Sequence, residues 1–287
     1  MKTIKLFIVT FIVALGLTSC TSDGDDSPKI DINPMSEFNL LANIEANGHS
    51  LELYSEGNDS FRTGYNEIFV RVKDNADENY FANPEITWMP VMHMVSMNHS
   101  CPKSDLIITE ENNTVVKGYL VFQMAGITDE FWDITFTYKV EGQEYSLTET
   151  IDVIAPSDGK QKVTSFMGSD DVRYVLAMVE PSEPQVAVND IQAMLFKMES
   201  MMSFPQVENY TILLDPRMPG MGNHSSPNNV DLTYDTAAKS YNGKLSLTMT
   251  GYWKLSLKLL NGTGEVLKGE DVTEENEASS LYFELEF

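Results

Sequence analysis

One sequence pattern occurs twice in this chain and limits the folds that it can adopt. Residues 88–102 read W-M-P-V-M-H-M-V-S-M-N-H-S-C-P, and residues 215–227 read D-P-R-M-P-G-M-G-N-H-S-S-P. Both stretches place a Met-x-x-Met pair before a histidine and end in N-H-S-[CS]-P. Each copy continues with Met-x-Gly, a tryptophan and an alternating strand, from Met124 and from Met249. An internal repeat of this kind predicts two copies of one structural unit.

Short stretches of alternating apolar and polar residues, separated by Gly, Pro and Asn, predict β-strands in both copies. In the clearest stretch, residues 67–73, the side chains of Ile68, Val70 and Val72 share one face. No long amphipathic helical pattern competes with the strands. Residues 156–159 (P-S-D-G) have the composition of a linker. The sequence therefore predicts an all-β protein with two tandem β-sandwich domains, over residues 39–156 and 157–287.

The start of the chain has the features of an export signal. Lys2 and Lys5 precede an apolar run over residues 7–17, and the sequence L-T-S-C that ends at Cys20 reads as a lipobox. The apolar run is shorter than the roughly 20 residues that a membrane-spanning helix needs. Signal peptides of this kind are removed from the mature protein, so residues 1–19 are excluded from the fold.

The lipobox resembles bacterial lipoprotein signals, which implies a lipid on Cys20 that anchors the chain to a membrane. Residues 20–38 are then a tether, because their polar and acidic composition does not favour a packed core. The acidic run 23–26 resembles the signal of Bacteroidetes lipoproteins that are displayed on the cell surface. We therefore expect an outer-membrane location, at the cell surface or otherwise on the periplasmic face. The alternatives are ordinary secretion with a chance cysteine and a plain flexible spacer.

The second copy of the repeat resembles the YtkA-like domain, an immunoglobulin-like β-sandwich of exported bacterial proteins that is often linked with copper handling. The family pattern is P-x-M-P-x-M-x-x-H, then Y-x-G, then M-x-G-x-W-x-[LI]. The matching residues are Pro216, Met218, Pro219, Met221, His224, Tyr241, Gly243, Met249, Gly251 and Trp253. The first copy departs from the pattern, since M-V-S-M replaces M-P-x-M and one residue is missing before His99. The resemblance implies two immunoglobulin-like domains and an association with copper.

Thioether sulfur and imidazole nitrogen are the side-chain ligands that suit a soft ion such as Cu(I). Thioethers do not titrate, so such a site also works where thiols are oxidised. We expect one copper site in each domain, formed by Met94, Met97 and His99 and by Met218, Met221 and His224. Additional candidate ligands are Met92, His93, Cys101, Met124 and Met249. The protein would capture Cu(I), or hand it over to an outer-membrane receptor or a periplasmic carrier.

A purely structural interpretation of the same residues is also open, because methionine fills irregular cores and adaptable binding surfaces. We expect Trp132 and Trp253 to be the central core residues of the two sandwiches, and His49 to lie at the surface. Core or edge packing is expected for Met194, Met198, Met201 and Met202. The rival hypothesis is therefore a cell-surface immunoglobulin-like scaffold or accessory protein, whose methionine-rich loops bind a protein partner without metal.

Composition and motifs exclude several other functions. The chain has 19 Lys and Arg against 43 Asp and Glu, a formal net charge of −24, which repels nucleic acid. With Cys20 lipidated, Cys101 is the only thiol left, so no intramolecular disulfide can form. The sequence contains no Ser-His-Asp arrangement, phosphate-binding glycine loop or H-E-x-x-H motif. We therefore expect a binding protein rather than an enzyme.

Overall fold

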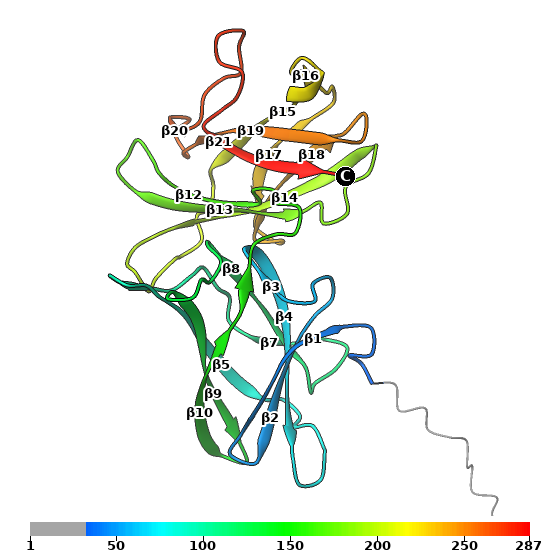
Figure 1. Ribbon diagram of the computed structural model, residues 1–287, viewed down its shortest axis with the longest axis vertical. Coiled ribbons are helices and arrows are strands. Elements are labelled where there is room, and N and C mark those ends of the chain that lie inside the picture. Colours follow the sequence, from blue (N-terminus) through cyan, green and yellow to red (C-terminus); the bar gives the residue numbers. More distant parts are fainter. Residues whose placement is uncertain (1–32) are drawn as a thin grey trace, which may run out of the picture. The chain divides into compact units, whose positions relative to one another are not determined.

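The computed structural model describes residues 33–287, and the chain from Glu37 onward forms one compact unit (Figure 1). Within this part of the chain the regular structure consists of β-strands and one short 3-10 helix, η1 (Pro219–Met221), which confirms the all-β prediction. No helix in residues 33–287 is long and apolar enough to cross a membrane. Cys20 and the expected signal peptide lie outside the described residues.

The first half of the unit is a two-layer sandwich, called here the first sandwich. An antiparallel sheet of order β1-β2-β4-β8-β7 packs against a second sheet of order β10-β9-β5-β6, and β3 pairs with β11 in parallel. The strand bounds are β1 (Asn39–Ala46), β2 (His49–Ser55), β3 (Phe61–Arg62), β4 (Gly64–Asp74), β5 (Glu85–His93), β6 (Asn98–His99), β7 (Ile107–Ile108), β8 (Val116–Phe122), β9 (Phe131–Val140), β10 (Gln143–Ile151) and β11 (Val153–Ile154).

Alternation of side chains along the strands builds the core of the first sandwich. In β9, Trp132, Ile134, Phe136 and Tyr138 are buried, while the residues between them are more exposed. The strand predicted over residues 67–73 lies within β4, and Ile68, Val70 and Val72 on its predicted apolar face are all fully buried. Burial of large side chains at this spacing removes apolar surface from water, which is the main source of stability for such a sandwich.

The second half, called here the second sandwich, is a ten-stranded antiparallel sheet that folds over its own core. Along the sheet the order is β12-β13-β14-β18-β17-β15-β19-β20, with β16 paired to β15 and β21 to β19. Strands from both ends of this order contribute to one hydrophobic core. The bounds are β12 (Val163–Met167), β13 (Arg173–Glu180), β14 (Val188–Lys197), β15 (Thr211–Met218), β16 (His224–Ser225), β17 (Val230–Asp235), β18 (Ser240–Ser246), β19 (Tyr252–Leu260), β20 (Val266–Lys268) and β21 (Leu281–Glu286).

The two sandwiches meet through a separate cluster of buried apolar side chains. Val121 of β8 packs with Val175 and Ala177 of β13 and with Met194 and Phe196 of β14. Among the described residues, no strand of β1–β11 pairs with a strand of β12–β21. The contact between the sandwiches therefore depends on side-chain packing rather than on a shared sheet.

Candidate metal centres

In the first sandwich, a histidine, a methionine and a tryptophan form a row across three neighbouring strands. Met92 of β5 is the register partner of His99 on β6 and of Trp132 on β9. Directly opposed residues of an antiparallel pair project to the same face, with Cβ atoms about 4.5–5.5 Å apart. The ring of His99 also contacts that of Trp132 edge-on, with 5.6 Å between centroids. The register thus brings a thioether, an imidazole and an indole together at the core face.

The same row recurs in the second sandwich. Met218 of β15 is the register partner of His224 on β16. On the other side of β15, the pairing with β19 ends at Arg217 and Lys254, the residues next in sequence to Met218 and Trp253. Met218 and Trp253 are both members of the second core. The repeat in the sequence therefore corresponds to a repeat in space, and we call each set of three residues a His-Met-Trp row.

The register changes which methionines are equivalent in the two copies. Met92, rather than Met94, is the counterpart of Met218, because each is the register partner of the histidine of its sandwich and lies in the same core as the tryptophan. Residues 93–98 connect methionine to histidine in the first copy and residues 219–223 do so in the second, so the first connection is one residue longer. The two Met-x-x-Met pairs therefore match in sequence but not in structure.

The methionines of each candidate site differ in exposure. Met92 and Met218 are 0% and 5% exposed, whereas Met97 and Met221 are 47% and 59% exposed. Met94 is partly buried against the first core, and its N–H donates to the carbonyl of Met97 at 3.0 Å in a tight turn. Each histidine is thus the register partner of a buried thioether and follows a connection that carries an exposed thioether.

The Met-x-Gly and Trp motif has a structural explanation in both copies. Trp132 Nε1 donates to the carbonyl of Met124 at 3.0 Å, and Trp253 Nε1 donates to that of Met249 at the same distance. Both indoles are fully buried, which confirms them as core residues. A Cβ placed on Gly251 would lie 3.4 Å from the methyl group of Met218, so the glycine leaves room for this methionine. The side chain of Met124 is partly buried, and that of Met249 is exposed.

His93 lies on the outer face of its sheet, away from the row. Its Nε2 is 2.7 Å from Oδ2 of Asp133, and its ring stacks on Phe131 with 4.9 Å between centroids. Met92 precedes it in β5 and points into the core, as the alternation of a strand requires. His93 and His99 are therefore on opposite faces, and His93 belongs to a separate polar pair.

The thiol of Cys101 lies inside the first core. The residue is buried among the apolar side chains of this cluster, and burial raises the pKa of the thiol well above its ordinary value. Copper ligation by cysteine uses the thiolate, which this environment disfavours. The arrangement therefore favours a packing role for Cys101 over its role as an additional ligand.

We expect the Cys101 thiol to react with an aromatic disulfide reagent more than about a hundredfold more slowly in the folded chain than in the unfolded chain. Reaction requires local opening of the core, because the sulfur has almost no contact with solvent. The absorbance of the released aromatic thiolate measures the rate. The protein used is a soluble form of the chain in which Cys20 is replaced by serine. Rapid reaction of one thiol per folded chain would contradict this placement.

Two expectations about individual residues are wrong. His49 is buried rather than at the surface, with its Nδ1 3.2 Å from the Tyr138 hydroxyl and its ring against Phe81 and Tyr145. Met201 and Met202 are exposed instead of packed, although Met194 is buried as expected. The carbonyl of Met201 accepts a 2.7 Å hydrogen bond from the N–H of Ser100, next to His99. A loop of the second sandwich thus borders the first candidate site.

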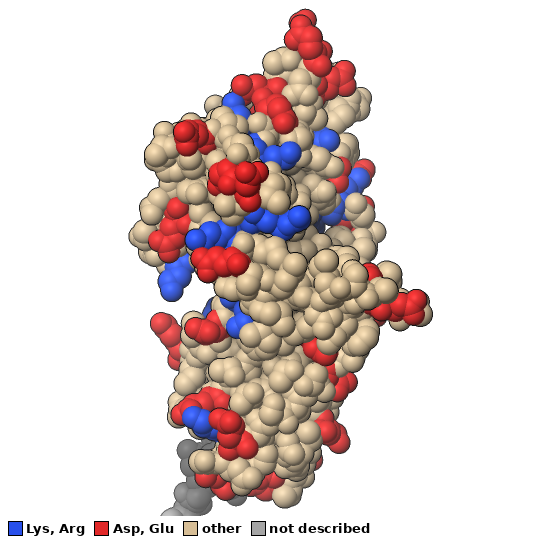
Figure 2. Space-filling model, turned by 90° about the vertical axis from the view of Figure 1, so that its left-hand side faces the viewer, with Lys and Arg blue, Asp and Glu red and all other residues tan. Residues whose placement is uncertain are grey.

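Acidic side chains of residues 33–287 do not form a metal site of their own. Residues 33–287 contain no group of three or more His, Cys, Asp or Glu side chains that could hold a metal ion. Figure 2 shows one face on which acidic side chains are spread over both sandwiches rather than gathered in one patch.

Comparisons with known proteins do not identify the chain. No protein-family model matches it, and no curated protein matches it in sequence. Among solved structures, the crystal structure of a conserved domain protein from Bacillus anthracis is similar, at 9% sequence identity over 86% of each chain and a TM-score of 0.28. At this score the similarity carries no argument about the fold or the candidate sites.

Proposed function

We propose that this chain binds Cu(I) through one Met/His site in each sandwich and captures the ion or hands it over at the outer membrane. The observation that carries the proposal is the His-Met-Trp row, in which a buried methionine is the register partner of the histidine in both sandwiches. Packing alone requires a large apolar residue opposite the tryptophan, but it does not require a histidine on the strand beyond. A histidine retained beside a buried thioether in both copies favours ligation of a soft ion.

The donor set of each proposed site follows from the row. In the second sandwich, Met218 and His224 supply a sulfur and a nitrogen from paired strands, and Met221 supplies a second sulfur from η1. In the first sandwich, Met92 and His99 take the corresponding places, and Met94 and Met97 lie in the connecting turn. Two thioethers and one imidazole suit Cu(I), which accepts low coordination numbers and sulfur ligands.

Exposure supports transfer rather than permanent storage. His224 is exposed, and Met97 and Met221 are the more exposed thioethers of their sites. A partner could therefore approach the ion from the exposed side and replace these ligands one at a time. The expected lipid on Cys20 would keep the chain at the membrane, where the partner would be an outer-membrane receptor or a periplasmic carrier.

One observation favours the rival function, in which this face binds a protein partner without metal. Val95, in the turn that leads to Met97, has an exposed apolar side chain, and so have Ile127 of the β8–β9 loop and Phe131 at the start of β9. The N–H of Val95 donates to the carboxylate of Glu130 at 3.4 Å, which places the turn next to the β8–β9 loop. Exposed apolar groups that cluster in this way are typical of protein-binding surfaces.

A Cu(I) titration under reductant, against a competing chelator, tests the proposal. The wild-type chain is expected to bind two equivalents, and the triple variant Met218→Leu, Met221→Leu, His224→Ala is expected to bind one. Leucine keeps the volume of methionine, so the fold is retained. The matched control is Met167→Leu, which removes a similarly exposed thioether from β12 and should leave two equivalents. A stoichiometry that the triple variant does not change would refute the second site.

A further inference from the structure

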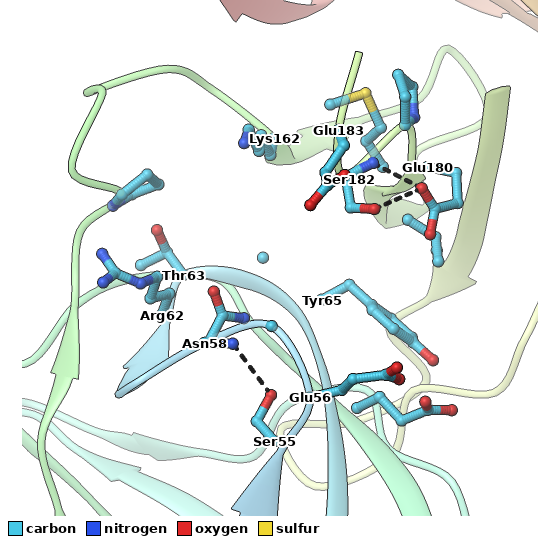
Figure 3. A pocket seen from close by; sticks show the side chains of 17 residues that line it. Ser55, Glu56, Asn58, Arg62, Thr63, Tyr65, Lys162, Glu180, Ser182 and Glu183 are labelled. Atoms are coloured by element: carbon cyan, nitrogen blue, oxygen red, sulfur yellow. Dashed lines mark hydrogen bonds between the residues drawn. The ribbon is translucent and has the colours of Figure 1, made fainter. Parts of the chain in front are cut away.

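A polar cleft of about 640 Å³ lies between the two sandwiches, apart from both His-Met-Trp rows (Figure 3). The first sandwich contributes the segments around Glu56 and Arg62, and the second contributes Lys162 and residues 178–183. The volume falls within the roughly 300–1,000 Å³ that is usual for small-molecule sites, which often lie between domains. The sequence contained no motif that pointed to this cleft.

Packing beneath the cleft holds its walls in place. Tyr65 and Val179 line the cleft and also pack against the buried cluster that joins the sandwiches. Hydrogen bonds from the Asn66 side chain fix the turn on one wall, since its Nδ2 donates to the carbonyls of Arg62 and Gly64 at 2.7 and 2.9 Å. The cleft is therefore largely formed before any ligand enters, which lowers the entropic cost of binding.

One side of the cleft carries carboxylates. The N–H and Oγ of Ser182 donate to Oε2 of Glu180 at 2.6 and 2.8 Å, which fixes the position of this carboxylate. Neither of these two hydrogen bonds involves Oε1 of Glu180. Glu56 lines the cleft from the first sandwich, as does Glu67, whose Oε1 also lies 3.4 Å from Lys117 Nζ. Burial raises the pKa of the Tyr65 hydroxyl, and the charges of Glu67 and Glu180 raise it further, so both sandwiches make this side negative.

The opposite side carries two cations. Figure 3 shows Arg62 and Lys162 across the cleft from Glu56 and Glu180. Arg62 Nη2 bonds to Asp59 at 2.8 Å, but the Asp59 side chain is 77% exposed. Lys162 Nζ lies 3.6 Å from Asp158. Ion pairs that remain in contact with solvent contribute little, so a ligand carboxylate can share these cations at small cost.

We propose that this cleft binds a small zwitterion, namely a short peptide with free termini. Its ammonium group pairs with Glu180 and the neighbouring glutamates, and its carboxylate pairs with Arg62 and Lys162. Opposite charges on facing walls fit a ligand with charges at both ends, and a simple anion would be repelled by the glutamates. The site is independent of copper, because none of its lining residues is a proposed copper ligand.

Calorimetric titration of the purified chain with trialanine, in metal-free buffer, tests the proposal. We expect saturable binding that weakens about tenfold or more with N-acetyl-trialanine and with trialanine amide, because each lacks one charged end. Glu180→Gln and Arg62→Gln are expected to weaken binding of free trialanine to a similar degree. Glutamine at position 180 can still accept the bonds from Ser182, and Glu183→Gln provides a second test at the cleft wall.

The matched control is Glu85→Gln, which removes an exposed carboxylate on β5 outside the cleft and should leave trialanine binding unchanged. Absence of saturable heat at millimolar trialanine would overturn the proposal. Equal binding of the free, acetylated and amidated peptides would also overturn it. Binding of 1,4-diaminobutane as tight as that of trialanine would show a cation site and contradict the role of Arg62 and Lys162.

Discussion

Replacement of Trp253 by alanine is expected to lower the free energy of unfolding of the second sandwich by about 3–5 kcal/mol. The indole is fully buried at the centre of its core, and its Nε1 is bonded to the carbonyl of Met249. The substitution leaves a large cavity and also leaves this carbonyl without its partner. Urea denaturation followed by circular dichroism measures the loss, and Trp132→Ala should have a similar effect on the first sandwich.

Two comparisons make this result specific to the tryptophans. Trp253→Phe keeps most of the buried area and loses the Nε1 bond, so it should cost less than the alanine variant does. Met167→Leu, at the surface of β12, should change stability by less than about 0.5 kcal/mol. Stability of Trp253→Ala within that margin of the wild type would contradict the central placement of the indole.

Met92→Leu is expected to weaken Cu(I) binding at the first site by about a hundredfold or more, whereas Met94→Leu is expected to have a much smaller effect. Met92 lies opposite His99 in the register, while Met94 lies in the turn beyond the strand. Mutation of a residue that only hydrogen-bonds to a metal ligand typically lowers metal affinity about 10–100-fold. Loss of the ligand itself should lower the affinity at least as much. Leucine preserves the volume at this buried position, so the loss reports on sulfur rather than on packing.

The comparison is best made in the Met218→Leu, Met221→Leu, His224→Ala background, in which only the first site remains. Competition with a chelator of known affinity then measures a single dissociation constant for each variant. His99→Ala should reproduce the effect of Met92→Leu, because the two residues contribute from paired strands. A larger loss for Met94→Leu than for Met92→Leu would show that the turn, rather than the row, holds the ion.

The fold class could be predicted because β-strands with one buried face have a clear period in sequence. β9 is an example, in which Trp132, Ile134, Phe136 and Tyr138 are apolar and buried at every second position. The two tryptophans were also predictable as core, since each precedes an alternating strand in its copy of the repeat. Strand β2 shows the limit of this signal, because all its residues from His49 to Ser55 are buried and no alternation remains. The burial of His49 therefore could not be predicted.

The composition of the candidate sites was predictable, but the pairing of their residues was not. The letters M-x-x-M before the histidine align Met94 with Met218, whereas the strand register aligns Met92 with it. Register depends on strand pairing and on the length of the connection, which differs by one residue between the copies. The shared P-x-M sequences, at Pro90 and Pro216, were the available signal, because both prolines occupy the same register position opposite β9 and β19.

Other features depend on tertiary contacts that no local pattern encodes. The exposed loop at Met201 reaches Ser100 across the boundary between the sandwiches. The polar cleft likewise combines Arg62 with Glu180, two residues far apart in sequence. Such contacts arise from the packing of one sandwich on the other, which involves few residues and no repeated motif.

X-ray absorption at the copper edge of the Cu(I)-loaded chain tests the central claim most directly. The account predicts a Cu(I) ion bound by both sulfur and imidazole nitrogen in the wild type. It also predicts loss of the imidazole contribution, with weaker copper retention, in the double variant His99→Ala, His224→Ala. A spectrum with nitrogen and oxygen ligands alone, or one that the double variant leaves unchanged, would contradict the assignment of the His-Met-Trp rows as copper sites.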